Sequence, residues 1–371
     1  MSRKVLLAVP ALTAILTLAG ASAASAQTWI VNQNRQKPAD LTTEQLRAIA
    51  PLPLPRESKG AGGKAAAKGT PQVFPGFVPA EEPAPAETTA LTPPADWDGP
   101  LIRYEAQTDD SRSKGSSGYP FTTTRVFPDT AVSTAPYRMA GKLLFRDSVT
   151  NSWYMCSAAI ISYRLVLTAG HCVYNATGKR FYTDFRFTPG YNATLGTQPY
   201  GQWTWSAVYT TPAWQNGGGT VPNVSDFGII EIANRTIGGV SRTIGGYLGY
   251  YATATARLNY NHLTALGYPG NIDSGGRMIA NQGETRPNGS TSGVMGSSMA
   301  GGSSGGPWIE DFGTVGSGQL VANSVANRIV GVTSYGPAGG PSPYFYQGSS
   351  ILNADFTTMR TTACARLAGN C

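Results

Sequence analysis

Charged residues and histidines are scarce in this sequence. Only 13% of its 371 residues are charged, and it contains two histidines and four cysteines. So little charge, together with 45 glycines and 26 prolines, argues against long helices and coiled coils. A hydrophobic content of 41% argues against wholesale disorder. We therefore expect an all-β fold rich in turns.

Clustered positive charge is also missing. The chain carries 28 Lys and Arg against 21 Asp and Glu, a net charge of +7, but the cations after residue 126 are mostly isolated arginines. A surface that binds a polyanion needs a clustered basic face. The sequence therefore argues against nucleic acid as a partner.

The spacing of the cysteines argues against a zinc site, because the four cysteines and two histidines contain no C-x-x-C pair. In an exported chain, cysteines are expected to form disulfides. Four thiols allow three connectivities. We favour local pairing, with Cys156 bonded to Cys172 and Cys364 bonded to Cys371. Neither a metal nor another cofactor is implied.

The only long apolar stretch lies at the N-terminus. Arg3 precedes the apolar run Val5 to Gly20, and Ala24 to Ala26 provide small residues for cleavage. This run is shorter than a membrane anchor needs. We interpret residues 1–26 as a signal peptide. The protein is then expected to be secreted, extracellular or periplasmic, without stable membrane association.

Residues 27–118 are rich in Pro, Ala, Glu and Lys and poor in apolar periodicity. Such a composition cannot bury enough surface to offset its conformational entropy. We therefore predict a propeptide or a linker that is largely disordered. The exception is Leu41 to Ile49, where Thr42 and Gln45 have the spacing of a capping box and predict a short helix. Whether this region is a spacer or an inhibitory propeptide stays open.

Residues 119–371 contain short apolar or alternating runs separated by turn residues, a pattern typical of a sandwich or a barrel. The length suits two six-stranded barrels, which we place at about 126–250 and 251–355. Residues 354–365 are predicted to form a terminal helix held by the second disulfide.

The search for a catalytic base is short, because histidine is the natural general base near neutral pH and there are only two. His171 lies in VLTAGHC, directly after an apolar strand and next to Cys172. His262 lies among polar turn residues and is interpreted as a surface or strand-edge residue. His171 is therefore the candidate base.

The candidate nucleophile is Ser304, in the sequence GGSSGGP. Its glycines allow backbone N–H groups to approach a substrate carbonyl closely, although a flexible Gly/Ser loop is the plainer interpretation of so short a motif. The third member must be a carboxylate that orients the imidazole. Among Asp184, Asp226 and Asp273, only Asp226 opens a strongly apolar strand, FGIIEI.

With His171, Asp226 and Ser304 in this order, the sequence resembles the chymotrypsin-like, or trypsin-like, serine endopeptidases. The matching motifs are TAGHC at 168–172, SDFGII at 225–230 and GSSGGP at 302–307. Two further motifs are most similar to the bacterial glutamyl-endopeptidase branch, namely FTPGYN at 187–192 and LGYPG at 266–270. The resemblance covers about 126–355 and implies two antiparallel β-barrels and a peptidase that forms an acyl-enzyme. An α/β-hydrolase would need its histidine after the serine, and none follows Ser304.

The resemblance also implies binding roles. The backbone N–H groups of Gly302 and Ser304 would form the oxyanion hole. Ser298 would lie at the base of the primary specificity pocket, and Ser334, Tyr335 and Gly336 would form one wall and pair with the substrate as an added strand. Polypeptides are the implied substrates, and we expect a monomer.

Two departures from the family pattern limit these expectations. Ser303 stands where animal digestive members have an Asp that pairs with a newly formed N-terminus, so that zymogen switch is not expected, although cleavage before Val126 is conceivable. Ser298 offers no charge partner for Arg or Lys, and Thr333 and Ser334 are not the histidine that the glutamyl branch uses. The alternative to an active protease is an inert exported binding module with the same fold.

Overall fold

The structure is a computed structural model of the 371-residue chain. It describes residues 28–32, 40–58, 71–83, 119–195, 198–256, 258–313, 326–337 and 346–371. The predicted signal peptide, residues 1–26, lies outside the described residues.

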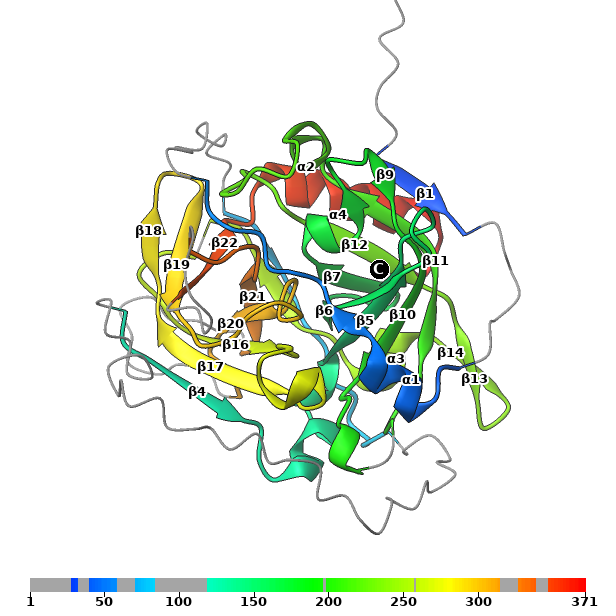
Figure 1. Cartoon of the computed structure of the whole chain (residues 1–371). Helices are drawn as coiled ribbons and strands as arrows, with labels where there is room; N and C mark the ends of the chain where they lie inside the picture. Colours follow the sequence, from blue (N-terminus) through cyan, green and yellow to red (C-terminus); the bar gives the residue numbers. More distant parts are fainter. Residues whose placement is uncertain are drawn as a thin grey trace, which may run out of the picture.

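Six antiparallel strands form a closed barrel in the first half of the protein (Figure 1). Around the ring they are β10 (Thr183–Pro189), β5 (Ala140–Arg146), β6 (Trp153–Ile160), β7 (Leu165–Thr168), β12 (Gly228–Ile232) and β11 (Trp203–Thr210). The ring is closed because β11 pairs with both β12 and β10. The predicted all-β class and the first six-stranded barrel are confirmed.

The described part of the second half contains two sheets. The larger has the order β3 (Val73–Phe74), β15 (Ala252–Ala254), β21 (Arg328–Val332), β20 (Pro307–Glu310), β16 (His262–Gly267), β17 (Ile279–Glu284) and β4 (Phe121–Arg125). The smaller has the order β18 (Arg286–Asn288), β19 (Ser292–Gly296) and β22 (Tyr346–Ser350). This differs in detail from a second closed antiparallel ring, since β15 pairs with β21 in parallel and β4 occupies the free edge of β17.

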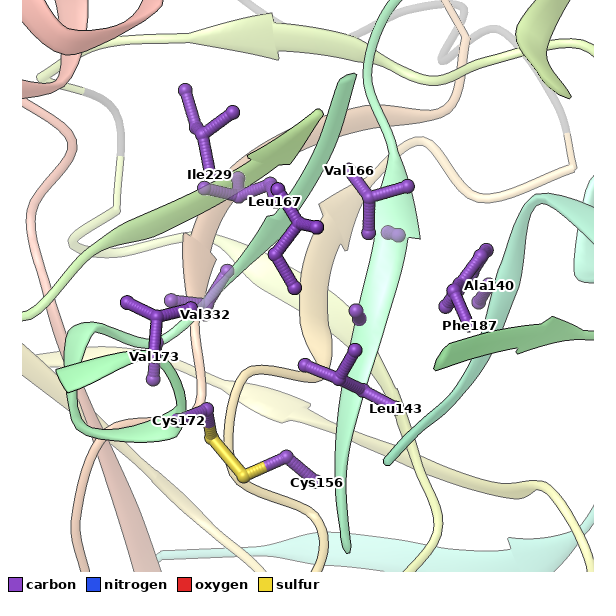
Figure 2. Close-up of a cluster of buried hydrophobic side chains, with 14 of the residues drawn as sticks. Ala140, Leu143, Cys156, Val166, Leu167, Cys172, Val173, Phe187, Ile229 and Val332 are labelled. Carbon is purple, nitrogen blue, oxygen red and sulfur yellow. A yellow bond between two sulfur atoms is a disulfide. The ribbon is translucent and has the colours of Figure 1, made fainter. Parts of the chain in front are cut away.

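The core of the first barrel includes the disulfide between Cys156 and Cys172 (Figure 2). All five residues of β12 are buried, as expected for a strand covered on both faces. Val332 of β21 reaches the same cluster from the second half. Both predicted disulfides are present, because Cys364 is bonded to Cys371.

A C-terminal helix, α4 (Ala354–Arg366), agrees with the predicted terminal helix. Asn353 caps its N-terminus, and Arg366 at its last turn pairs with the buried Glu231 of β12. Burial alone would raise the pKa of Glu231, but hydrogen bonds from Arg366 and Ser206 bring that pKa below its usual value. None of the helices in the described part of the chain is long and apolar enough to cross a membrane.

Three described pieces of the N-terminal region pack against the barrels. The strand β1 (Trp29–Val31) pairs with β11, and β3 pairs with β15. The predicted capping box is present, and it opens α1 (Thr43–Ala48). The helix leads into β2 (Ala50–Pro51), which pairs with β6 in parallel. These described parts of 27–118 are therefore ordered elements of the fold, which apolar periodicity did not indicate.

Lys142 on β5 is a buried amine that lies against α1. Its Nζ donates to the carbonyl oxygens of Leu46 at 3.3 Å and Gly275 at 3.1 Å. Burial lowers the pKa of Lys142 from 10.5 to about 7. Between these values the unfolded chain binds more protons at this residue than the folded chain does. Folding therefore becomes more favourable as the pH rises through this window.

We expect Lys142 to contribute up to about 1.4 kcal/mol per pH unit to the rise in the free energy of unfolding above pH 7. Lys142→Met removes the titrating group and should flatten this part of the curve. Denaturant unfolding of both chains at several pH values measures the difference. Parallel curves would show that Lys142 does not titrate in this range.

Candidate active site

The turn that carries His171 is held by covalent and steric constraints. It follows β7 as a short 3₁₀ turn (Gly170–Cys172), and the disulfide from Cys172 ties it to β6. A side chain at Gly170 would place its Cβ 2.9 Å from an oxygen of Asp226 and 2.9 Å from the ring of Trp214. Glycine is therefore needed at this position, and the turn can pack directly against Asp226.

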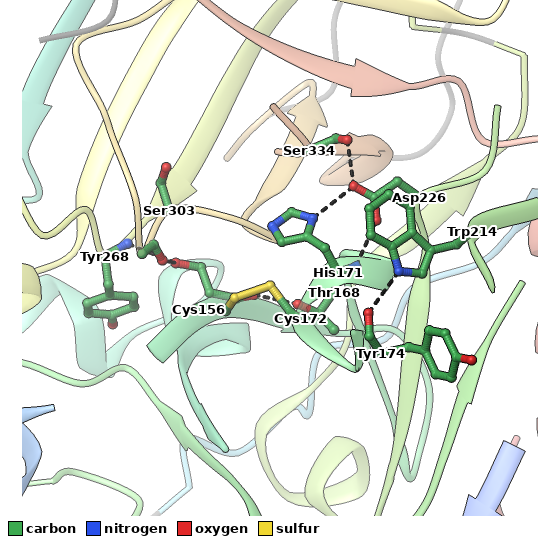
Figure 3. The surroundings of a disulfide bond; sticks show 12 residues. Cys156, Thr168, His171, Cys172, Tyr174, Trp214, Asp226, Tyr268, Ser303 and Ser334 are labelled. Carbon is green, nitrogen blue, oxygen red and sulfur yellow. Dashed lines mark hydrogen bonds and ion pairs between the residues drawn. A yellow bond between two sulfur atoms is a disulfide. The ribbon is translucent and has the colours of Figure 1, made fainter. Parts of the chain in front are cut away.

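Asp226 holds His171 through both of its carboxylate oxygens (Figure 3). Oδ1 accepts the backbone N–H of His171 at 2.8 Å, and Oδ2 lies 2.8 Å from Nδ1 of the ring. The hydroxyl of Ser334, from a separate loop, also donates to Oδ2 at 2.6 Å. Because a carboxylate only accepts, this arrangement places the ring proton on Nδ1 and leaves Nε2 as an acceptor.

Ser304 lies in the glycine-rich loop between β19 and β20 and is fully buried. Its carbonyl accepts the backbone N–H of Ser157 at 2.7 Å, which ties the loop to β6 beside Cys156. Neither the Ser304 hydroxyl nor Nε2 of His171 has a hydrogen-bond partner among the described residues. The structure thus joins His171 to Asp226 directly but does not form a hydrogen bond from Ser304 to His171.

The backbone of Gly302 presents a hydrogen-bond donor beside Ser304. Gly302 has a φ of +94°, and a Cβ there would lie 2.6 Å from the carbonyl oxygen of Tyr268. The Ser157 hydroxyl fixes the loop further by donating to the carbonyl of Gly302 at 2.9 Å. The N–H of Gly302 donates to the carbonyl of Leu52 at 3.1 Å. An oxyanion hole requires such a fixed donor.

The four expected substrate-binding residues have different surroundings. Ser298 is half-buried, and its carbonyl accepts from Asn271. Ser334 is turned toward Asp226, whereas Tyr335 is fully buried with its hydroxyl bonded to Ser292. Gly336 uses its N–H and its carbonyl to pair with residues 55 and 57. Of the predicted wall, therefore, Gly336 pairs with residues 55 and 57, whereas the backbones of Ser334 and Tyr335 pair with Gly348 of β22.

The residues rejected as candidates lie elsewhere in the protein. His262 is exposed at the start of β16. Asp184 pairs with Arg146, and Asp273 pairs with Arg125. These aspartates are engaged by arginines, so neither is positioned to orient His171.

The roles of Ser334 and Ser157 were missed by reasoning from the sequence. Ser334 was expected to contact substrate, but its hydroxyl supports Asp226. Ser157 was not considered, although it contacts both Ser304 and Gly302. Neither residue lies in a motif that indicates these contacts.

Potential metal ligands gather at the disulfide. Ligand atoms of Cys156, His171 and Cys172 lie within 4.8 Å of one another. Both sulfur atoms are bonded to each other and so are not thiolates. This group does not fit a metal ion.

Part of this chain is similar to known proteases. Residues 134–246 match the family model described as trypsin. This chain contains a trypsin-like domain. It is 30% identical over 127 residues to the glutamyl endopeptidase of Bacillus licheniformis, an alignment that covers 34% of this chain and 36% of that protein. The match thus spans little more than a third of the curated relative's length.

Two solved structures share the fold of the trypsin-like domain. The protease Anisep from Arthrobacter nicotinovorans has a TM-score of 0.50 and 24% identity, covering 62% of this chain and 96% of that one. A thermostable serine protease, AL20, from an extremophilic microorganism has a TM-score of 0.50 and 22% identity, covering 62% of this chain and 98% of that one. At these identities the likeness establishes the fold alone.

Proposed function

We propose that this protein is a serine endopeptidase that hydrolyses peptide bonds through an acyl-enzyme, with His171, Asp226 and Ser304 as its catalytic residues. The observation that carries the proposal is the two-point contact between Asp226 and His171, 2.8 Å at each oxygen, in a trypsin-like domain. The tether of the Ser304 loop to β6, beside the disulfide that holds the His171 turn, adds support.

In the proposed mechanism, Nε2 of His171 accepts the proton of Ser304 as the hydroxyl attacks the scissile carbonyl. Asp226 stabilises the imidazolium that forms, which then protonates the leaving amine. The backbone N–H groups of Gly302 and Ser304 stabilise the oxyanion, and the loss of one such donor typically costs about 3 kcal/mol. Water then releases the acyl group by the same steps in reverse order.

The proposed substrates are polypeptides, bound along Ser334 to Gly336 with the residue before the scissile bond above Ser298. Strong selection for Arg or Lys is not proposed, because Ser298 carries no charge. We further propose that the chain is exported by residues 1–26, is processed within 27–118 and acts as a monomeric protease domain over 119–371. The two disulfides are consistent with an oxidising compartment.

A fluorophosphonate, which adds covalently to an activated serine, tests the proposed function. On prolonged incubation we expect one adduct per chain, located on Ser304 by mass spectrometry of peptides, and none on the Ser304→Ala chain. Because the adduct is irreversible, even a cleft that opens rarely is eventually labelled. A folded chain that never acquires the adduct would instead fit an inert binding module.

A further inference from the structure

The segment after α1 crosses between the two halves of the protein (Figure 1). The N–H of Leu52 donates to Met155 at 2.9 Å, and the carbonyl of Leu52 accepts from Gly302 at 3.1 Å. Farther along, the carbonyl of Pro55 accepts the N–H of Gly336 at 2.8 Å, and the N–H of Glu57 donates to the carbonyl of Gly336 at 2.9 Å. Residues 51–58 therefore occupy the N–H of Gly302, one of the two proposed oxyanion donors, and the backbone of Gly336 at the end of the proposed substrate wall.

The side chains of residues 51–54 alternate in exposure. Pro51 and Pro53 are exposed, whereas Leu52 is half-buried and Leu54 is 4% exposed, packed against Ala300. Alternation with a period of two is expected for an extended strand with one face on the protein. The prolines also restrict the backbone to extended conformations, so that less entropy is lost when the segment binds.

A polar contact fixes the far end of the segment. The carboxylate of Glu57 accepts from the amide of Asn288 at 2.8 Å and from the hydroxyl of Tyr346 at 2.6 Å. Hydrogen bonds to a carboxylate are stronger than those between neutral groups. The segment is therefore held by side-chain contacts specific to its sequence as well as by its backbone.

The direction of the segment is opposite to that of the proposed substrate. Under the proposed function, the residues before the scissile bond lie along Ser334 to Gly336 and the scissile carbonyl lies at Gly302 and Ser304, so the substrate runs from Gly336 toward Gly302. The segment instead begins at Met155 and ends at Gly336. Its pairing with Gly336 is parallel, as is the pairing of β2 with β6. A substrate running the other way would pair antiparallel to both.

We propose that residues 51–58 are a built-in inhibitor that fills the substrate cleft in the reverse direction. This inference rests on the proposed function, since it concerns access to Ser304. The carbonyl of Leu52 lies at Gly302, where a substrate would place its scissile carbonyl. Because the direction is reversed, the nitrogen of Pro53 lies on the side of Gly336, where a substrate has the residues before the scissile bond. The segment therefore blocks the cleft without presenting a correctly oriented peptide bond.

The neighbouring helix α1 keeps the inhibitor next to its site. Leu46 and Ile49 are buried in the core, and Lys142 donates to the carbonyl of Leu46. A segment attached in this way rebinds at a high effective concentration whenever it opens. Full activity then requires the segment to be displaced or cut away.

The rate of labelling by the fluorophosphonate tests inhibition in the full-length chain. Leu54→Glu places a charge where an apolar side chain is buried and should free the segment. We expect at least a tenfold faster adduct formation and a similar rise in peptide turnover. Glu57→Ala, which removes two hydrogen bonds without adding a charge, should give a smaller rise. Val78→Glu, at a 47% exposed site of the same N-terminal region, is the matched control and should leave both rates unchanged.

Hydrogen exchange provides a readout that does not depend on activity. In full-length Ser304→Ala, the amides of Leu52 and Glu57 should exchange slowly, and adding Leu54→Glu should make them exchange fast. Fast exchange without Leu54→Glu would overturn the proposal. The segment could exchange slowly in Ser304→Ala and fast once Leu54→Glu is added, while the full-length chain and its Leu54→Glu variant are labelled at equal rates. That result would overturn inhibition and leave the proposed function intact. No adduct on either chain, with the segment freed in Leu54→Glu, would overturn the proposed function itself.

Discussion

Replacing Ser304 with alanine is expected to lower peptide turnover by about 10⁶-fold, to background. The hydroxyl is the proposed nucleophile, and the hydroxyl of the adjacent Ser303 is engaged by Ala300 and Gln347. The Ser304 hydroxyl has no hydrogen-bond partner among the described residues, so its removal should leave the fold unchanged. Turnover is best measured with a mixed peptide library in both the full-length and the Leu54→Glu chains, because the open cleft of the latter widens the measurable range.

Ser303→Ala is the control from the same loop. The Ser303 hydroxyl donates to the carbonyl of Ala300 and accepts from Gln347, so its loss should lower the free energy of unfolding by about 1 kcal/mol and change turnover much less. If Ser304→Ala retained turnover in a folded chain, another residue would have to be the nucleophile.

Asp226→Asn is expected to lower turnover by about 10⁴-fold. Each oxygen of Asp226 accepts a hydrogen bond, one from the backbone of His171 and the other from its ring and from Ser334. An amide has one accepting end, so it cannot satisfy both sets of donors. If its NH₂ group faces the ring, the proton moves from Nδ1 to Nε2, and the imidazole can no longer accept the proton of Ser304.

Asp184→Asn is the matched control, because Asp184 was a rival candidate and pairs with the partly exposed Arg146 at the protein surface. We expect its turnover to stay within about twofold of the unmodified chain, in line with the small contribution of exposed ion pairs. Measuring the peptide turnover of both variants in the Leu54→Glu chain distinguishes the role of Asp226 from that of Asp184. Equal losses from both would argue against a specific role for Asp226.

Local signals in the sequence predicted local structure well. The spacing of Thr42 and Gln45 predicted the capping box that opens α1, and the positions of the four cysteines favoured the two disulfides that are present. These features depend on residues that are near one another in the chain. The contact of Asp226 with His171 was anticipated from an apolar strand that begins at the aspartate, and their catalytic roles stay predictions.

Apart from the contact of Asp226 with His171, contacts between distant segments were not predicted. The composition of residues 27–118 indicated disorder, yet residues 51–58 are held by Met155, Gly302 and Gly336. The edge of β17 is occupied by β4, which the expected pair of closed rings did not include. In both cases the contacts are largely backbone hydrogen bonds, which nearly every residue type can form.

The sequence by itself determined the chemistry available to this protein, namely one imidazole after an apolar strand, one carboxylate at the start of another and a serine among glycines. It did so because reactivity belongs to residue types and their immediate neighbours. Only the tertiary structure decided that Ser334 supports Asp226 and that the segment around Leu54 fills the cleft in reverse. The direction of this segment, and the fact that it occupies the cleft, follow from the path of the backbone through space. The residue types at single positions do not encode that path.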